Sequence, residues 1–275
     1  MTIVAEPVPR GTVVATVGRQ ARDWIPALAV FVLGIAVWQL SIQVFGIERF
    51  LLPKPGAIVS RFWDARDELW RAGWFTFKEA LGGFVVGSTF AILFALLLAR
   101  FRRVGDALMP IAIAANAIPI IAFAPIFNAW FDPLQPTSKM AVAGVLCFFP
   151  VMVNTLRGLT SVRPTQVELM RSYGAGEVAI FRRVRVPTAL PYTFSALKVA
   201  TVLAMIGAIV GEYFGGSQEA LGIRIKNSAA LFDFETAWAA ILVASILGIA
   251  FYLAVALLER LTLQWDPTRQ ERGSA

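Results

Sequence analysis

Few residues in this chain carry the side chains that acid–base, nucleophilic or metal chemistry requires. It has no histidine, and its one cysteine, Cys147, lies within an apolar run. The missing histidine excludes Ser-His triads, histidine general bases and most zinc sites, and a single cysteine forms no intramolecular disulfide. The sequence also lacks the G-x-S-x-G and G-x-x-x-x-G-K-[ST] patterns of nucleophile elbows and phosphate-binding loops. We therefore expect no catalytic residue, no metal site and no cofactor bound by this chain.

The remaining chemical candidates are polar side chains inside apolar segments, where hydrocarbon offers them no partner. Asn116 lies in the middle of such a segment, so its amide must find partners in protein, water or substrate. Lys198 and Glu212 lie near opposite ends of another segment, where a functional role and contact with the membrane boundary remain equally open. For Thr201 and Met205, helix packing is the favoured alternative to a role in transport. The candidate lining of a translocation path is Asn116, Phe123, Asn128, Asn154, Thr201, Met205 and Glu212.

These residues belong to apolar segments that match the length of a membrane crossing. The chain of 275 residues is 57% apolar and 16% charged, whereas soluble domains are about one quarter charged. A transmembrane helix needs about 20 mostly apolar residues, and six segments qualify. They are 25–45, 77–99, 107–131, 140–156, 192–213 and 237–258. The sequence therefore predicts an all-α membrane protein with six transmembrane helices.

Two of these segments carry distinctive residues. The second segment contains Gly82, Gly83 and Gly87, and the third contains Pro110, Pro119 and Pro125. Small residues allow helices to approach closely in lipid. Broken backbone at prolines is tolerated in a membrane only inside protein or along a cavity. We therefore expect the third segment to border the translocation path.

The basic residues mark one side of the membrane. The net charge of +7 does not indicate nucleic-acid binding, because the basic residues lie between apolar segments and not in an aromatic-lined patch. Arginines cluster in 100–103, in the loop 157–191 and in the last residues, 259–275. Short loops rich in Lys and Arg remain cytoplasmic. Both termini are therefore expected in the cytoplasm, with the first apolar segment acting as an uncleaved signal anchor.

At this level the chain divides into three parts. A cytoplasmic tail, 1–24, precedes the membrane domain 25–258, and a second cytoplasmic tail covers 259–275. Within the membrane domain, 55–71 and 221–234 combine apolar and charged residues at helical spacing. This pattern predicts two amphipathic helices along the extracytoplasmic interface.

The loop 157–191 has the pattern of two short helices joined by a turn. Pro164 suits the first turn of a helix, and Gly174 stands where a helix end takes the left-handed conformation. Pro187 and Pro191 are expected to delimit the return to the membrane. Apolar residues recur before the glycine at Val167, Met170 and Tyr173 and after it at Val178, Phe181 and Val184. Apolar stripes on an exposed loop indicate a surface that binds a partner.

This loop resembles the EAA loop of binding-protein-dependent ABC importer permeases. That family pattern begins with Glu-Ala-Ala, has a glycine six positions after the glutamate, and ends with apolar-X-apolar-Pro. Glu168, Gly174 and Pro187 occupy this register, while Leu169 and Met170 replace the alanines with other apolar residues. The runs 117–125, 149–155 and 212–216 also resemble the nitrate, sulfonate and taurine branch, which includes permeases for thiamine-pyrimidine precursors and riboflavin.

The resemblance implies a type I importer fold and a division of labour among separate proteins. Two permease subunits pair, as a homodimer or a heterodimer, and each docks its loop into a cleft of an ATPase that binds ATP and Mg²⁺. A binding protein delivers a small solute at the outer face of the plasma membrane of a prokaryote. The implied ATPase-coupling residues are Glu168, Met170, Arg171, Ser172, Tyr173, Gly174, Ala175 and Gly176.

Other classes and the substrate stay open at this point. An energy-coupling-factor type transmembrane subunit is the main alternative, although it is expected to have two arginine-containing coupling helices and this chain has one suitable loop. An intramembrane enzyme needs catalytic residues, and a channel needs no docking loop. The substrate is either an anion such as nitrate, sulfonate or taurine, or an aromatic heterocycle such as a pyrimidine precursor or riboflavin. We favour the heterocycle, because no Arg or Lys lies at mid-span and aromatic residues crowd the third and fourth segments. These residues are Phe123, Phe127, Trp130, Phe148 and Phe149.

Overall fold

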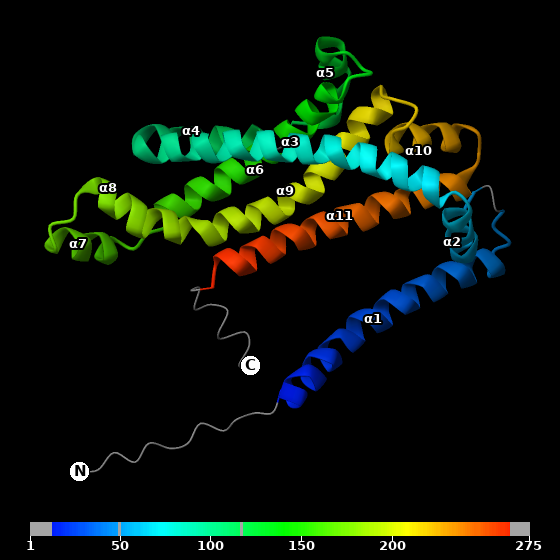
Figure 1. Cartoon of the computed structure of the whole chain (residues 1–275), viewed down its shortest axis with the longest axis horizontal. Coiled ribbons are helices and arrows are strands. Elements are labelled where there is room, and N and C mark those ends of the chain that lie inside the picture. The colour runs from blue at the N-terminus through cyan, green and yellow to red at the C-terminus, as the bar shows by residue number, and fades with distance from the viewer. Residues whose placement is uncertain (1–12, 49–50, 116–117, 265–275) are drawn as a thin grey trace.

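Four long helices form the body of the protein (Figure 1). The structure, a computed structural model, describes residues 13–48, 51–115 and 118–264. The long helices are α3 (Arg66–Arg100), α6 (Pro136–Thr160), α9 (Val186–Phe214) and α11 (Phe234–Thr262). Within the described residues, four helical stretches are long and apolar enough to cross a membrane, α9 being counted with the short helix before it. They correspond to the second, fourth, fifth and sixth predicted segments.

The first and third predicted segments take a different form. The third is not one helix: α4 (Arg102–Ala115) is followed by a short 3-10 turn (Ile120–Phe123) and by α5 (Ala124–Phe131). Pro119 precedes the 3-10 turn in an extended conformation, because proline has no N–H to continue the helix. The first segment lies in α1 (Val13–Val44), which begins inside the predicted tail. Their apolar helical stretches, Leu28–Val44 and Ile121–Phe131, are shorter than the four long ones.

Small residues bring α3, α6 and α9 close together. A Cβ atom added at Gly87 would lie 2.3 Å from the carbonyl oxygen of Gly144, and one at Gly207 would lie 2.7 Å from the Cα of Ala143. The backbones of the three helices therefore approach one another directly, as the glycines of α3 predict. Around these glycines, buried alanines fill the core: Ala91, Ala95, Ala143, Ala200 and Ala204.

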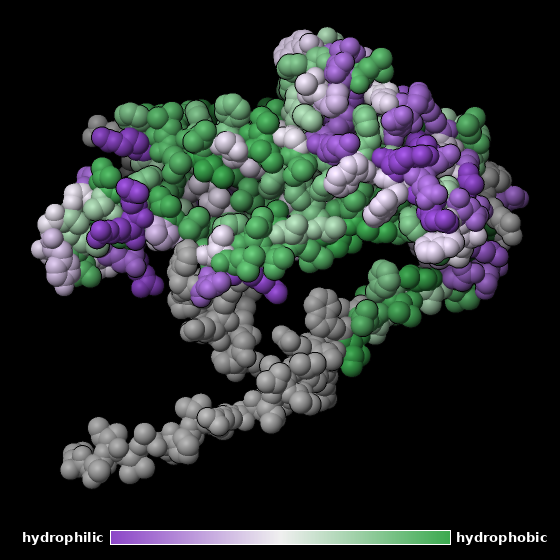
Figure 2. Space-filling model, viewed as in Figure 1, coloured by the Kyte–Doolittle hydropathy of each residue, from purple (hydrophilic) through white to green (hydrophobic). Residues whose placement is uncertain are grey.

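The outer sides of the long helices are apolar. Figure 2 shows hydrophobic residues along them and hydrophilic residues gathered near the two ends of the bundle. Phe90 on α3 is 65% exposed and Ile249 on α11 is 61% exposed. Large apolar side chains exposed in this number suit a hydrocarbon solvent. The chain is therefore embedded in a membrane.

The helix α1 stands apart from the bundle along most of its described length (Figure 1). The ring centroids of Trp38 and Trp238 lie 5.0 Å apart, so α1 meets α11 at that point. Further toward its start, Val30 and Phe31 are 70% and 66% exposed. This leaves an apolar helix face without an intrachain partner among the described residues.

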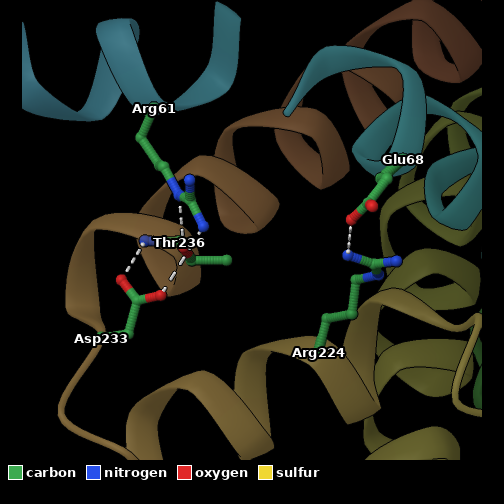
Figure 3. Close-up of polar contacts among 5 residues, drawn as sticks. All are labelled: Arg61, Glu68, Arg224, Asp233 and Thr236. Carbon is green, nitrogen blue, oxygen red and sulfur yellow. Dashed lines mark hydrogen bonds and ion pairs between the residues drawn. The ribbon is translucent and has the colours of Figure 1, made fainter. Parts of the chain in front are cut away.

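Two ion pairs fasten the short helices at one end of the bundle (Figure 3). The predicted helix 55–71 is divided at Ala65 into α2 (Pro55–Asp64) and the first turns of α3. Arg61 Nη2 of α2 lies 4.0 Å from Asp233 Oδ2, and Arg61 Nε donates a hydrogen bond of 2.7 Å to Thr236 Oγ1 of α11. Arg224 of α10 (Leu221–Ala230) donates a hydrogen bond of 2.9 Å to Glu68 Oε2 of α3. The predicted helix 221–234 is thus confirmed over its first ten residues.

Candidate functional site

The segment between α6 and α9 forms a helical elbow. It consists of α7 (Pro164–Ser172) and α8 (Glu177–Ile180), and we call residues 164–180 the elbow. Gly174 has φ +76°, its N–H donates to the Arg171 carbonyl at 2.9 Å, and the Ala175 N–H donates to the Met170 carbonyl at 3.0 Å. These two bonds form a Schellman motif, in which a left-handed glycine ends a helix. The two predicted helices and the glycine turn are confirmed.

An ion pair closes the elbow on itself. Arg171 Nη2 of α7 lies 2.7 Å from Glu177 Oε1 of α8. Both side chains are more than half exposed, so the pair contributes little to overall stability. Its effect is local, because it joins the helices on either side of the glycine turn.

The elbow presents apolar side chains to its surroundings. Tyr173 is 82% exposed, Val178 is 72% exposed and Leu169 is 58% exposed, and α7 contains no buried residue. The predicted second stripe is only partly exposed, since Phe181 packs against the main core and Val184 is half-buried. Ile180, fully buried, anchors α8 to the bundle. The exposed apolar surface therefore lies around the glycine turn.

The connection from the elbow back to the bundle is continuous. After α8, one π-helical turn (Phe181–Arg185) leads directly into α9. The Val186 N–H donates to the Phe181 carbonyl across this turn, which places Pro187 in the first turn of α9. Pro191, which together with Pro187 is expected to delimit the return to the membrane, lies inside α9. The second helix of the elbow, α8, is thus continuous with a long helix.

A small polar pocket of 270 Å³ lies beneath α7. Its lining includes Glu168 and Arg171 from α7, Arg185 from the π turn, and Ala99 at the end of α3. Glu168, the first residue of the family pattern, thus lies in a pocket that it shares with two arginines. The pocket places the start of the elbow against the ends of the long helices.

The candidate path residues lie at several depths of the bundle. Asn128 of α5 is buried, and its Nδ2 donates to the Gly211 carbonyl at 3.3 Å. Asn154 Nδ2 donates to the Pro150 carbonyl of its own helix at 2.8 Å. Thr201 and Met205 are buried within the bundle, and Phe123 is half-buried on the 3-10 turn. Asn116 lies outside the described residues.

Glu212 belongs to a buried charged cluster that sequence reasoning missed. Glu79 of α3, Lys139 of α6 and Glu212 of α9 are 2%, 1% and 0% exposed. The signal for Glu79 was present, since it is a carboxylate within an apolar helix. Lys139 precedes the predicted fourth segment by one residue, and this position indicated only a loop lysine.

Lys198 also has a partner that the sequence analysis placed in the C-terminal tail. Its Nζ lies 2.7 Å from Glu259 Oε2, with side-chain exposures of 21% and 11%. Glu259 lies in the last turn of α11, which extends to Thr262. The pair links α9 to α11 near the end of the bundle that carries the elbow.

Long apolar helices joined to an exposed helical elbow define a membrane-embedded protein with a surface for a partner. The model of the family described as "Binding-protein-dependent transport system inner membrane component" matches residues 87–264, which include the elbow, α6, α9 and α11. The chain belongs to this family and is an ABC importer permease. This assignment decides against an energy-coupling-factor subunit.

Three relatives with transport names resemble the chain over most of its length. The riboflavin transport system permease protein RibX of Chloroflexus aurantiacus is 33% identical over 90% of this chain and 93% of its own. The formylaminopyrimidine transport permease protein ThiX of Halalkalibacterium halodurans is 36% identical, with coverage of 86% and 93%. The putative aliphatic sulfonates transport permease protein SsuC of Escherichia coli is 28% identical, with coverage of 90% and 95%.

Proposed function

We propose that this permease couples ATP hydrolysis on a separate ATPase subunit to uptake of a small solute, and that the elbow is where the ATPase docks. The observation that carries the proposal is the exposed apolar surface at the glycine turn, headed by Tyr173 at 82% exposure. Apolar patches of this kind on an exposed element mark protein interaction sites. ATP and Mg²⁺ bind to the ATPase, and the permease contributes the coupling residues from Glu168 to Gly176.

The continuity of the elbow with α9 supplies the mechanical link. Ile180 and Phe181 pack into the bundle, and no loop separates α8 from α9. A displacement of the elbow by the ATPase is therefore passed to α9, whose other end holds Glu212. Thr201, Met205 and Glu212 are buried in the single chain, so a route past them opens only when helices separate during the transport cycle. Phe123, Asn128 and Asn154, with Asn116, complete the proposed lining.

The proposed orientation places the elbow and both termini in the cytoplasm of a prokaryote. Arg157, Arg163 and Arg171 lie in or beside the elbow, and Arg182, Arg183 and Arg185 follow it. Such enrichment is typical of cytoplasmic loops. Six spans, with α1 and the α4–α5 segment crossing as well, put both termini, the arginines at 100–103 and the elbow on one side of the membrane. The opposite end, with α2 and α10, then receives the binding protein.

We further propose that two copies of the chain form the working permease. The described part of α1 exposes apolar side chains that have no intrachain partner there, such as Val30 and Phe31. A second permease chain would cover part of this surface, and lipid would cover the rest. A dimer also gives each of two ATPase subunits one elbow to bind.

An aromatic heterocycle is the proposed class of solute. The relatives at 33% and 36% identity are named for riboflavin and formylaminopyrimidine, and the sulfonate permease, at 28%, is less similar. Phe123, Phe127 and Trp130 form a chain of ring contacts with centroid distances of 6.1 and 5.8 Å. Such rings offer stacking surfaces to a planar solute. Sulfonate, nitrate or taurine is the alternative.

Reconstitution tests this function. Proteoliposomes that contain the permease and its ATPase, supplied with the binding protein, are expected to accumulate labelled riboflavin or formylaminopyrimidine only when ATP is present on the ATPase side. Uptake of a labelled sulfonate, with no uptake of either heterocycle, would support ATP-coupled import but contradict the proposal that the solute is an aromatic heterocycle. Uptake without ATP or without the ATPase would overturn the coupling proposal.

A further inference from the structure

Three charged side chains are buried together at the end of the bundle opposite the elbow. Glu79, Lys139 and Glu212 come from three different long helices and are each at most 2% exposed. Burying charge costs free energy unless the charges are balanced and hydrogen-bonded. The coupling of ATP hydrolysis to the elbow makes no use of these groups, so they require a separate explanation.

Glu212 joins α9 to the start of α10. Its Oε2 accepts a hydrogen bond of 2.7 Å from the Gly222 N–H. Beside it, Thr76 Oγ1 of α3 accepts a hydrogen bond of 3.0 Å from the Leu221 N–H. Two of the unpaired N–H groups at the start of α10 are thereby satisfied.

Gly222 permits this approach. A Cβ atom added there would lie 2.5 Å from the Ile209 carbonyl oxygen and 2.7 Å from the Glu212 Cβ. Any other residue would therefore separate α10 from α9. The carboxyl group of Glu212 and the start of α10 form one tightly fitted contact.

The other carboxyl oxygens lack a donor. Glu79 Oε2 and Glu212 Oε1 are buried, and neither has a hydrogen-bond partner among the described residues. The two carboxyl groups nevertheless lie within hydrogen-bonding reach of each other. Two ionised carboxylates are acceptors only and repel each other, whereas a protonated carboxyl group is a donor. One proton placed between the groups would satisfy both oxygens.

Lys139 sets the charge balance of the cluster. Its Nζ donates to the backbone carbonyls of Pro133 and Gln135 at the start of α6. One shared proton leaves the carboxyl pair with a single negative charge, which equals the charge of Lys139. The cluster is then neutral and every polar group has a partner.

The neighbouring helices supply few other charges to this cluster. Asp132, the C-cap of α5, acts on Lys139 from an exposed position, so its charge is screened and does not belong to the buried balance. From α10, Arg224 is paired with Glu68. From α11, Glu259 is paired with Lys198 and Glu235 lines a separate pocket beside Arg61. On α3, Lys78 is exposed.

We propose that Glu79 and Glu212 share one proton, and that this proton site, balanced by Lys139, fastens α10 to the ends of α3, α6 and α9. Removal of the proton at alkaline pH puts two negative charges against one positive charge in a buried site. The contact with α10 therefore weakens as pH rises. The inference does not depend on the solute or on the ATPase.

Infrared spectroscopy of the purified full-length chain tests the proton site. At neutral pH the parent protein is expected to show the C=O band of a protonated carboxyl group, shifted in D₂O. Glu79→Gln and Glu212→Gln should each abolish that band, since the amide replaces the proton and the remaining carboxylate balances Lys139. Glu259→Gln is the matched control and should retain the band. A parent protein without the band, or a band that survives both substitutions, would overturn the proposal.

Thermal unfolding of the same chain tests the charge balance. Each single glutamine variant should keep a Tm close to that of the parent, because one negative charge remains. The double variant leaves Lys139 without a balancing charge and should lower Tm by about 10 °C, and adding Lys139→Met should recover most of the loss. A double variant as stable as the parent would contradict the balance. If a variant fails to fold, the infrared band of the parent protein still tests the proton site. The band is expected to disappear as pH is raised, and a band that persists at alkaline pH would contradict the proposal.

Discussion

Arg171 Nη2 and Glu177 Oε1 lie 2.7 Å apart across the glycine turn of the elbow, and this ion pair joins α7 to α8. The pair is exposed, so it adds little to the stability of the whole chain. Its position gives it a different role, because the apolar side chains around the turn must be presented in one arrangement to bind a partner. Rigid presentation reduces the entropy lost on binding.

The left-handed glycine of the elbow gives the first prediction. Gly174→Val places a β-branched residue at φ +76°, which costs about 1–2 kcal/mol and rearranges the turn. We expect binding of the ATPase to fall by at least about tenfold while membrane insertion is unchanged, as measured by co-purification. The control is Gly46→Val, where φ is +62° and the added side chain also meets open space, outside the elbow. Equal losses for both variants would mean that a strained glycine position anywhere in the chain, and not the elbow, causes the effect.

The exposed tyrosine gives the second prediction. Tyr173→Ala removes the most exposed aromatic ring of the elbow, and truncation of an anchor of this kind costs more than about 1 kcal/mol of binding energy. The affinity for the ATPase should fall about tenfold with no change in Tm. Leu231→Ala, at the opposite end of the bundle and 78% exposed, should leave the affinity unchanged. An unaltered affinity in the tyrosine variant would place the binding surface elsewhere.

The Lys198–Glu259 ion pair gives the third prediction. Lys198→Met removes the ammonium group that pairs with the Glu259 carboxylate, whose side chain is 11% exposed. Breaking a buried ion pair costs about 3–5 kcal/mol. The exposure of the lysine makes the lower figure the expected one. A double-mutant cycle with Glu259→Met should show that the two losses are not additive. Additive losses would mean that the two side chains act independently.

Helix packing gives the fourth prediction. Gly87→Ala sets a methyl group against the backbone of Gly144, 2.3 Å from its carbonyl oxygen, so α3 and α6 must separate. We expect a lower Tm and a smaller yield of folded protein. Gly34→Ala is the matched control, because that glycine also lies in an apolar helix but has open space around it. Alanine favours a helix there by up to about 1 kcal/mol, so the control should be neutral or stabilising.

Periodicity and special residues predicted the parts of the fold that depend on local rules. Apolar segments of sufficient length marked the four long helices, and Pro164 and Gly174 marked the start and end of α7. The π turn before α9 was not predictable in this way, because prolines usually end helices. In the structure, Pro187 lies in the first turn of α9 and Pro191 lies inside that helix. Local patterns also gave no sign that α1 stands apart from the bundle.

Buried polar pairs depend on distant parts of the chain, and the sequence analysis therefore missed them. Lys198 and Glu259 are 61 residues apart, and their pairing follows from the packing of α9 on α11. Glu79 meets Glu212 only because small residues bring α3 and α9 together. A charged residue in an apolar helix signals that a partner exists, but only the three-dimensional arrangement shows which one.

Site-directed cross-linking is the most direct test of the elbow as the docking site for the ATPase. The full-length permease carrying Tyr173→Cys, assembled with its ATPase in lipid, would be treated with a cysteine-reactive cross-linker, and Leu231→Cys would serve as the control. The native Cys147 is fully buried, so the introduced cysteine is the one that reacts. We predict a permease–ATPase product for position 173 and none for position 231. Absence of the product at 173, or equal yields at both positions, would contradict the assignment of the elbow.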